Sequence, residues 1–379
     1  MKKLLPEVCT IQYGFPFDSA KFSDSDGIPL IRIRDVVRGY SETYTTEEYK
    51  SEYIVHENDL LIGMDGEFNI AKWGKTPALL NQRVCRLAPK DSIDKDYLFY
   101  FMPVALKRIE EKTPFVTVKH LSAKELNKIE IPVLPLEEQR KIAETLSKVD
   151  ELIAFRDQQL AKLDELVKAR FVEMFGNPIE NTMNWPKKLL RDITIKIGSG
   201  ATPKGGRESY PNAGVSLIRS MNVYDGQFLY KDLAHLTEEQ ATQLNGVTVE
   251  AEDVLVNITG ASVARSCVVP KDVLPARVNQ HVAIVRCNRE LLNPIFTNKM
   301  FINNEFKKAL LSIGESGGAT RQAITKKQLE ELSVVVPPLS IQNEFFTFSE
   351  CVDQQKQTVQ QSLEKLKLMK KVLMQEYFG

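Results

Sequence analysis

The sequence predicts an α+β protein in which two similar α/β domains are separated by an intramolecular antiparallel coiled coil of two long helices, with pseudo-twofold symmetry. The first observation is an apolar residue at every seventh position between Leu136 and Gly176. The second is a similar run between Leu339 and Gly379. The third is that each run follows a globular stretch, and the two stretches repeat the same order of motifs. Heptad runs are typical of coiled-coil helices, and repeated stretches indicate duplication.

The run from Leu136 to Gly176 is expected to form one helix. It contains no proline and no glycine before Gly176, and Gly176-Asn177-Pro178 supplies the stop signal. At 1.5 Å per residue such a helix is roughly 60 Å long, too long for one element of a compact domain. Its apolar row therefore requires a second helix. The row consists of Leu146, Ile153, Leu160, Val167 and Met174.

The last stretch of the chain is the expected partner helix. It aligns with the first without a gap at an offset of 203, so that Leu136 and Gln139 of a Pro-Leu-x-x-Gln motif correspond to Leu339 and Gln342. Each helix has one strong apolar row and one interrupted row. The interruptions are Arg156 and Arg170 in the first helix and Lys356 and Lys370 in the second. Chain order predicts that the two helices pack antiparallel, each covering the apolar row of the other.

The remaining sequence divides into two globular blocks that repeat each other. Thr10-Ile11-x-x-Gly14 recurs as Thr194-Ile195-x-x-Gly198, and Asn81-Gln82 recurs as Asn279-Gln280. The offset rises from 184 at the glycines to 203 at the helices, so the second block has gained residues in its loops. The predicted boundaries are 1–135 and 177–336 for the first and second blocks, and 136–176 and 337–379 for the helices.

Within the first block the pattern predicts short strands and one helix. Apolar and β-branched runs between turn signals favour strands, and the 3.6-residue pattern of Asp96 to Glu111 favours a helix. The predicted strands are Ile28–Ile33, Asp59–Ile62, Arg83–Leu87 and Ile129–Val133.

Composition limits the class of protein. Fifty basic residues balance fifty acidic ones, so any DNA-binding surface must be a local patch. No run reaches transmembrane length, and the start of the chain lacks a signal-peptide pattern, so a cytoplasmic protein without a membrane partner is expected. The five cysteines are widely spaced and form no CxxC motif, which favours reduced, mostly buried thiols over a disulfide framework or a zinc site.

Catalytic motifs are missing from the sequence. There is no Asn/Asp-Pro-Pro-Tyr/Phe motif, which an amino-methyltransferase needs to hold a flipped adenine. There is no GxxxxGK[ST] phosphate loop and no HExxH motif, and the four histidines are scattered. These observations predict that the chain is not an enzyme by itself and holds no metal or cofactor.

Two similar domains held apart by a helix pair match the symmetry of a DNA target. A duplex offers two half-sites about 34–36 Å apart when they are separated by one helical turn. A rod of roughly 60 Å exceeds that spacing, but domains that lean inward from its ends reach both half-sites. The sequence therefore makes double-stranded DNA the expected ligand.

At this point the chain resembles a known family, the DNA-specificity subunits of type I restriction–modification systems. The resemblance rests on two blocks, each followed by Pro-Leu-x-x-Gln and a heptad helix ending in Phe-Gly, and it covers essentially the whole chain. Loop motifs similar to those of target recognition domains occur at residues 198–203, 259–262 and 317–321. The departures are Ile341, where the first copy has Glu138, and weak glycine motifs in the first block.

The resemblance implies a non-catalytic subunit of a DNA adenine methyltransferase/restriction endonuclease complex. Each block, as a target recognition domain, would read one half of a bipartite asymmetric site. The helix pair would set the gap and dock two methyltransferase subunits, and restriction (translocase/nuclease) subunits would join for cleavage. S-adenosylmethionine would then be bound by the methyltransferase partners. A stand-alone coiled-coil DNA-binding scaffold or repressor, without a modification partner, is the competing interpretation.

Candidate DNA contacts are side chains with long reach and forked donors in loops or at strand ends. The DNA-binding candidates are Arg32, Arg34, Lys72, Lys119 and His120 in the first block, and Lys204, Arg207, Arg219, Asn222, Arg265 and Arg321 in the second. The repeated Asn-Gln pairs are expected to fix a turn rather than to specify bases. The partner-docking candidates are Leu136, Gln139, Arg156, Arg170, Leu339 and Gln342. For Arg156 and Arg170 a second interpretation stays open, in which their stems lie along the helix seam.

Overall fold

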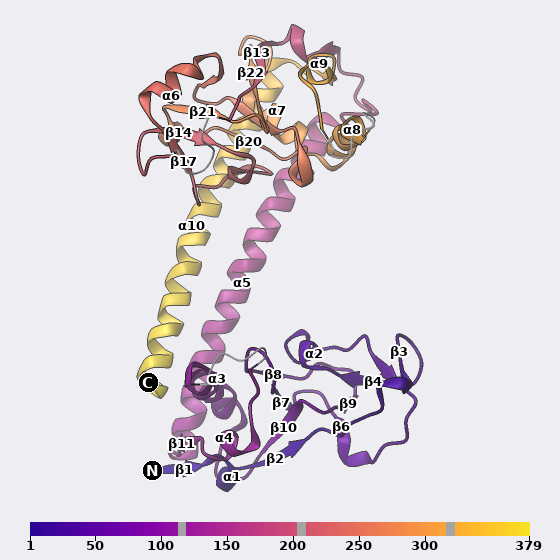
Figure 1. The fold of residues 1–379 in the computed structure, drawn as a ribbon, viewed down its shortest axis with the longest axis vertical. Helices are drawn as coiled ribbons and strands as arrows, with labels where there is room; N and C mark the ends of the chain where they lie inside the picture. The colour runs from indigo at the N-terminus through magenta and orange to yellow at the C-terminus, as the bar shows by residue number, and fades with distance from the viewer. Residues whose placement is uncertain (113–118, 203–209, 316–322) are drawn as a thin grey trace. The chain divides into compact units, whose positions relative to one another are not determined.

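The computed structural model describes residues 1–112, 119–202, 210–315 and 323–379 (Figure 1). The chain forms two compact units. Unit 1 contains Met1–Asp157 and Gln360–Gly379, and unit 2 contains Gln158–Val359. Each unit includes one globular block together with part of both long helices.

The described part of unit 1 contains two larger sheets and the two-stranded pair β1-β11. The first is antiparallel in the order β2-β10-β7-β8, and the second, in the order β3-β5-β4-β9-β6, contains one parallel pair, β4 with β9. Its described strands are β1 (Lys2–Leu4), β2 (Cys9–Tyr13), β3 (Phe22–Ser23), β4 (Ile28–Ile31), β5 (Tyr44–Thr45), β6 (Ile54–Val55), β7 (Leu60–Gly63), β8 (Asn69–Lys72), β9 (Ala78–Leu80), β10 (Val84–Pro89) and β11 (Glu130–Pro132).

The helices of unit 1 cover the first sheet and carry its main core. α3 places Tyr97, Phe101 and Leu106 against strand residues and against Leu146 of the long helix. The predicted strand Ile28–Ile33 ends early, because the Asp35 carboxylate accepts a hydrogen bond from the Arg32 amide and starts a helix. The helices are α1 (Leu5–Val8), α2 (Ile33–Arg38), α3 (Lys95–Lys112) and α4 (Ala123–Asn127), with 3₁₀ turns at Ser19–Lys21 and Ser51–Tyr53.

Unit 2 repeats this plan with additions. Its sheets run β13-β22-β19-β20 and β17-β14-β21-β18, and β14 with β21 is again a parallel pair. The strands are β12 (Lys187–Leu189), β13 (Thr194–Ser199), β14 (Val215–Ile218), β15 (Val223–Tyr224), β16 (Gln227–Phe228), β17 (Ala234–Leu236), β18 (Thr248–Val249), β19 (Val254–Asn257), β20 (Ser266–Val268), β21 (Ala276–Val278), β22 (Val282–Cys287) and β23 (Ser333–Val335). The helices are α6 (Glu238–Gln243), α7 (Pro294–Phe301), α8 (Asn304–Glu315) and α9 (Lys326–Glu330), with 3₁₀ turns at Leu190–Asp192, Ser220–Asn222, Asn245–Val247, Gly260–Ser262 and Lys271–Val273.

The strand registers correct one detail of the predicted repeat. Tyr13 lies opposite Cys85, and Ser199 lies opposite Ala283, the equivalent of Cys85. The next residues, Gly14 and Gly200, therefore correspond, and the predicted pairing of Gly14 with Gly198 is wrong. A β-bulge between Thr194 and Lys196 adds one residue to the strand of unit 2 and accounts for one of the two positions of this shift.

The two long helices are α5 (Leu136–Phe175) and α10 (Leu339–Phe378), each of 40 residues. They pack antiparallel within each unit. In unit 1 Asp150 pairs with Lys370 at 2.5 Å, and the Arg156 Nε donates to the Ser362 hydroxyl at 3.2 Å. In unit 2 Asp164 pairs with Lys356 at 2.6 Å. The charged residues that interrupt each apolar row are thus matched by polar groups on the other helix.

Gln139 and Gln342 join the start of each long helix to its own unit. Gln139 is fully buried; its Oε1 accepts from the Asp94 amide at 2.8 Å, and its Nε2 donates to the carbonyls of Leu134 and Ser92. Gln342, also fully buried, makes the equivalent bonds to the Asn293 amide and to the carbonyls of Pro337 and Leu291. These contacts give both glutamines a structural role in place of the predicted partner-docking role, because no part of either side chain reaches the surface.

Gln139→Ala is expected to lower the free energy of unfolding by on the order of 3 kcal/mol, because it leaves three buried backbone groups without a partner. Urea denaturation followed by circular dichroism measures the loss. Gln355→Ala, on an exposed face of α10, is the matched control and is expected to change stability by about 0.5 kcal/mol or less. Equal effects of the two substitutions would contradict the structural role of Gln139.

Candidate nucleic-acid interface

In unit 1 four backbone segments converge around the turn between β9 and β10. The segments are residues 14–15, 64–66, 81–83 and 119–121, and together they are called loop platform 1. The Gln82 amide donates to the Phe15 carbonyl, the Met64 amide donates to the Arg83 carbonyl at 2.9 Å, and the Leu121 amide donates to the Met64 carbonyl at 2.7 Å. Backbone hydrogen bonds between segments distant in sequence hold the platform rigidly together.

Unit 2 builds the same framework from residues 200–202, 258–260, 279–281 and 323–324, called loop platform 2. The Ile258 amide donates to the His281 carbonyl at 3.0 Å, and the Ile324 amide donates to the Ile258 carbonyl at 2.8 Å. An isolated β-bridge joins Thr259 to Ala323, as another joins Asp65 to His120 in platform 1. The two platforms are therefore equivalent in backbone structure.

Each platform includes a glycine that nothing larger can replace. A Cβ on Gly14 would lie 2.0 Å from the Asn81 carbonyl oxygen, and a Cβ on Gly200 would lie 1.6 Å from the Val278 carbonyl oxygen. Real Cβ atoms are never so close to a backbone oxygen. The glycines permit the β2 and β13 strand ends to touch the Asn-Gln turns.

The asparagines of the repeated Asn-Gln pairs fix these turns. Asn81 and Asn279 are 7% and 6% exposed, and their Oδ1 atoms accept from the amides of Gln82 and His281. This agrees with the turn-fixing role predicted for the pairs. The Gln82 and Gln280 side chains are exposed, and Gln280 contacts Thr202 and His281.

The two platforms present different side chains at equivalent positions. In platform 1 the Asp65 carboxylate contacts the His120 Nδ1 at 2.5 Å and the Arg83 Nε at 3.6 Å. In platform 2 the Thr259 hydroxyl contacts the His281 Nδ1 at 2.5 Å. In platform 1 the turn residue Arg83 is contacted by Asp65, which follows β7. In platform 2 the turn residue His281 is contacted by Thr259, which follows β19. A cluster with a carboxylate and a guanidinium in platform 1 thus corresponds to a hydroxyl and imidazole pair in platform 2.

The predicted DNA contacts of the first block occupy several places in unit 1. Lys119 and His120 belong to platform 1, and Lys119 also contacts Glu110. Arg32 caps α2, and Arg34 lies 3.7 Å from Asp35. Lys72 on β8 pairs with Asp96 at 2.8 Å and lies over the Phe99 ring, so it joins β8 to α3.

The predicted contacts of the second block differ in accessibility. Arg265 lies over the Tyr224 ring at 4.3 Å, and Arg219 donates to the Asp232 carbonyl. Asn222 is fully buried and bonds to backbone groups of residues 219, 229 and 231. These bonds give Asn222 a structural role in place of the predicted DNA contact. Lys204, Arg207 and Arg321 lie outside the described residues.

Among the predicted docking residues, Leu136 is 37% exposed, and Leu339 lines a cavity of about 550 Å³ together with Trp185 and Leu291. Arg156 contacts α10, as described above, and Arg170 donates to Glu344 of α10 at 3.1 Å. Each arginine thus contacts α10 from α5 while staying partly exposed. This favours the interpretation in which their stems lie along the seam over the one in which they dock a partner.

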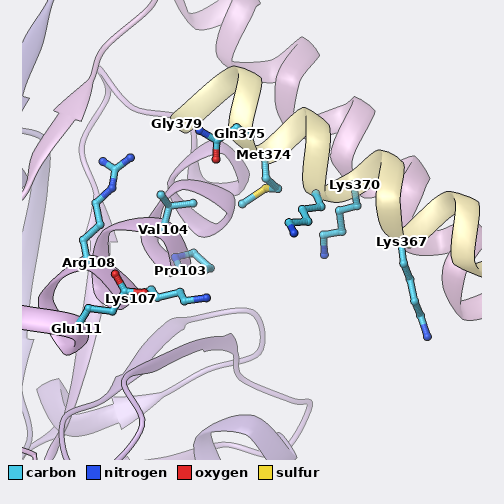
Figure 2. A pocket seen from close by; sticks show the side chains of 11 residues that line it. Pro103, Val104, Lys107, Arg108, Glu111, Lys367, Lys370, Met374, Gln375 and Gly379 are labelled. Atoms are coloured by element: carbon cyan, nitrogen blue, oxygen red, sulfur yellow. The ribbon is translucent and has the colours of Figure 1, made fainter.

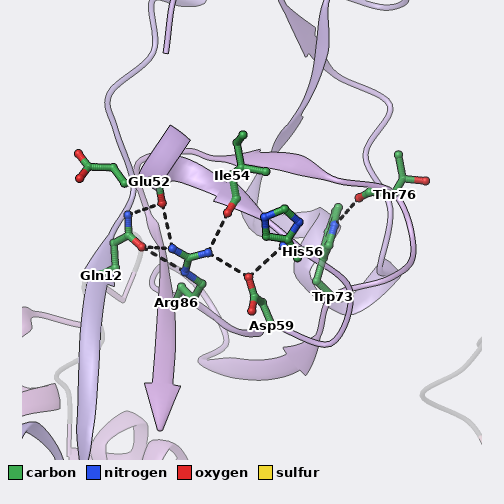
Figure 3. Close-up of polar contacts among 8 residues, drawn as sticks. All are labelled: Gln12, Glu52, Ile54, His56, Asp59, Trp73, Thr76 and Arg86. Carbon is green, nitrogen blue, oxygen red and sulfur yellow. Dashed lines mark hydrogen bonds and ion pairs between the residues drawn. The ribbon is translucent and has the colours of Figure 1, made fainter. Parts of the chain in front are cut away.

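A half-buried arginine ties the two sheets together in each unit. Arg86 donates to the Asp59 carboxylate at 3.0 Å, to Gln12, and to the carbonyls of Ile54 and Glu52 (Figure 3). In unit 2 Arg286 makes two bonds to Asp253 at 2.8 and 2.9 Å. The bonds to Asp253 raise the pKa of Arg286 above its usual value. The sequence did not predict that Arg86 and Arg286 would join the two sheets of their units.

A second surface feature of unit 1 is a basic cavity of about 500 Å³ between α3 and the last turns of α10. Figure 2 shows Lys107 of α3 and Lys370 of α10 pointing into the same space, with Met374 beside them. Lys370 is paired with Asp150. The other basic residues that line the cavity are Arg108, Lys367 and Lys371, and they make it attractive to anions.

No described helix is both long and apolar enough to cross a membrane. Within residues 1–112, 119–202, 210–315 and 323–379, no group of three His, Cys, Asp or Glu side chains has the spacing to hold a metal ion. Of the five cysteines only Cys351 is exposed, and burial raises the pKa of Cys9, Cys85 and Cys267 to about 12.

The fold and the two platforms define a duplicated α+β protein organised on an antiparallel helix pair. Residues 1–165 and 183–368 match the model of the type I restriction modification DNA specificity domain, and the chain belongs to that family. The specificity subunit of the type I restriction enzyme EcoBI from Escherichia coli is 30% identical over 391 residues, which cover 93% of this chain and 80% of that protein. The MjaVIII specificity subunit from Methanocaldococcus jannaschii is 23% identical, with coverage of 74% and 72%.

Solved structures show the same fold. The S subunit of a type I restriction-modification system from M. genitalium superposes with a TM-score of 0.60 at 15% identity, covering 100% of this chain and 96% of that one. A chain from a structure of type I R-M complex assembly gives a TM-score of 0.59 at 17% identity, covering 100% and 97%. The fold predicted from the sequence is therefore confirmed.

Proposed function

We propose that this chain selects the DNA site of a type I restriction–modification complex, with each globular block reading one half of a bipartite asymmetric sequence. The observation that carries the proposal is the pair of loop platforms. They share one backbone framework but differ at the Asp65/Thr259, Arg83/His281 and His120/Ala323 positions. A repeated framework with different polar side chains suits two readers of different half-sites.

The catalytic work in this proposal belongs to partner subunits. Two methyltransferase subunits that bind S-adenosylmethionine would modify adenine, and restriction (translocase/nuclease) subunits would join for cleavage. The exposed Leu136 and the cavity lined by Leu339 lie at the starts of the two long helices and are candidate docking surfaces. In this proposal the chain itself binds DNA and partners and performs no bond chemistry.

Methylome sequencing tests the proposed function. The full chain is co-expressed with its cognate methyltransferase subunit in cells that lack other adenine methylation. We expect methylation of one interrupted, asymmetric motif that disappears when this chain is omitted. Absence of any such motif, together with failure of the chain and the methyltransferase to co-elute in size exclusion, would favour a stand-alone DNA-binding scaffold or repressor.

The helix pair is expected to set the gap between the half-sites. Four residues inserted after both Leu160 and Leu363 keep the two helices matched in length and add about 6 Å to each. Methylome sequencing should then show the two half-sites unchanged and a gap longer by roughly two base pairs, or lost methylation.

The control for this experiment is the same four residues inserted after Asp24, in an exposed bend of unit 1. This insertion is expected to leave the gap unchanged, because loops tolerate added length. An unchanged gap in the doubly lengthened helix variant, with methylation retained, would rule out the helices as the element that sets the spacing.

A further inference from the structure

We propose that Arg83 reads a guanine in the half-site of the first block, and that Asp65 positions it for that purpose. The proposal rests on the proposed function and names the residue that performs one part of it. Arg83 is the third residue of the Asn81-Gln82-Arg83 turn at the centre of platform 1. Sequence reasoning assigned it only to the start of a strand.

The backbone of Arg83 shows that the turn is held in an unfavourable conformation. Its φ is +71°, in the left-handed region, which costs a residue other than glycine on the order of 1 kcal/mol. The surroundings impose this conformation, since the Arg83 carbonyl accepts from the Met64 amide and the Val84 amide bonds back to the Asn81 carbonyl. Glycine would adopt this backbone more easily, so the side chain of Arg83 is expected to have a use beyond folding.

Asp65 lies beside the Arg83 guanidinium, 3.6 Å from its Nε, and the Arg83 side chain stays accessible. Asp65 is 22% exposed, and the Arg83 side chain is 53% exposed. The His120 Nδ1 lies 2.5 Å from an Asp65 oxygen and 3.2 Å from the Arg83 Nη1. One imidazole nitrogen cannot donate to the carboxylate and accept from the guanidinium at once. The Arg83 guanidinium carries five N–H donors, and with more than half of the side chain exposed, donors remain available to a ligand.

This arrangement suits a base better than a phosphate. The carboxylate 3.6 Å from the guanidinium lowers the net positive charge of the cluster, which weakens attraction to the DNA backbone. The paired donors of an arginine fork remain, and they match the O6 and N7 acceptors of guanine in the major groove. Arg83, with Asp65 beside it and exposed donors, is therefore suited to recognising a guanine.

Loop platform 2 has a different side chain at the position equivalent to Arg83. At the position of Arg83 it has His281, held by the Thr259 hydroxyl where platform 1 has Asp65. Because His281 lacks the guanidinium fork, the two equivalent turns cannot read the same base in the same way. The difference between the half-sites would then follow from the side chain at one shared backbone position.

The test is methylome sequencing of the full chain with its methyltransferase, comparing the wild type with Arg83→Ala, Arg83→Lys and Arg83→Gly. We expect each substitution to relax the motif at one guanine of one half-site, with discrimination there falling about 5- to 150-fold. Lysine keeps the charge but lacks the fork, so it should not restore discrimination. Glycine relieves the positive φ, so loss of folding cannot account for its effect.

Three further variants are compared in the same experiment. Arg38→Ala, which removes an exposed arginine paired with Glu42, is the matched control and should leave the motif unchanged. His281→Ala should alter only the other half-site. Asp65→Asn should weaken discrimination at the guanine affected by Arg83, as expected of a positioning residue.

An unchanged motif in the Arg83 variants, or full restoration by lysine, would overturn the proposal. So would a uniform loss of methylation across sequences. A wild-type chain that directs no bipartite methylation would instead overturn the proposed function, so the two failures are distinguishable.

Discussion

Arg286→Met is expected to lower the free energy of unfolding of unit 2 by about 3–5 kcal/mol. Asp253 is 1% exposed, and both of its carboxylate oxygens accept hydrogen bonds from Arg286. Methionine fills part of the space of the arginine stem but leaves a buried carboxylate without its cation. Hydrogen exchange measured on peptides that contain β19 and β22 should show the loss of protection.

Two comparisons separate this effect from a general loss of charge. Arg289→Met removes an arginine that is 61% exposed and pairs with Glu252 at 2.8 Å, and it should cost about 1 kcal/mol or less. Arg86→Met removes the arginine that pairs with Asp59 in unit 1 and should cost less than Arg286→Met, because Asp59 is 27% exposed and water can solvate it. Similar losses for Arg286→Met and Arg289→Met would show that burial of Asp253 is not the cause.

Gly200→Ala is expected to destabilise unit 2 by on the order of 3 kcal/mol and to distort loop platform 2. The new Cβ would lie 1.6 Å from the Val278 carbonyl oxygen, and this oxygen belongs to β21, whose register with β14 fixes its place. The backbone of one segment must therefore move. Thermal unfolding measures the stability, and methylome sequencing should show a change confined to one half-site.

Gly198→Ala is the matched control, since it makes the same change two residues earlier in β13. No atom lies within 4 Å of a Cβ built on Gly198, so only a small effect on stability is expected. The comparison also tests the corrected repeat, in which Gly200 and not Gly198 is the equivalent of Gly14. Greater damage from Gly198→Ala than from Gly200→Ala would restore the pairing that the sequence motif suggested.

The long helices could be predicted closely, and the short strands only in part. A heptad pattern sustained over some 40 residues leaves little choice of conformation: α5 begins at the predicted Leu136, and α10 begins at Leu339, two residues after the predicted boundary at 337. Strands of two to six residues carry a weaker signal. The run Ile28–Ile33 has strand composition throughout, but the side chain of Asp35 converts its last residues into a helix start.

The candidate site was predictable only where its contacts are local. The turn-fixing role of the Asn-Gln pairs follows from side chains that bond within the same turn. The Arg83–Asp65–His120 cluster joins residues as far as 55 positions apart, so it depends on how the segments meet in the fold. Gln139 was assigned to the surface for the same reason, since the backbone groups that bury it belong to residues 45 and 47 positions away.

The equivalence of the two loop platforms has a consequence for how target choice can change. Their backbone bonds involve main-chain amides and carbonyls, whereas the side chains that differ, at 65, 83 and 120 and at 259, 281 and 323, lie on top of that framework. Substitution at these positions leaves the framework's own bonds in place. Under the proposed function, exchange of a few side chains on one platform would change the target at one half-site, while the backbone framework of both platforms stays the same.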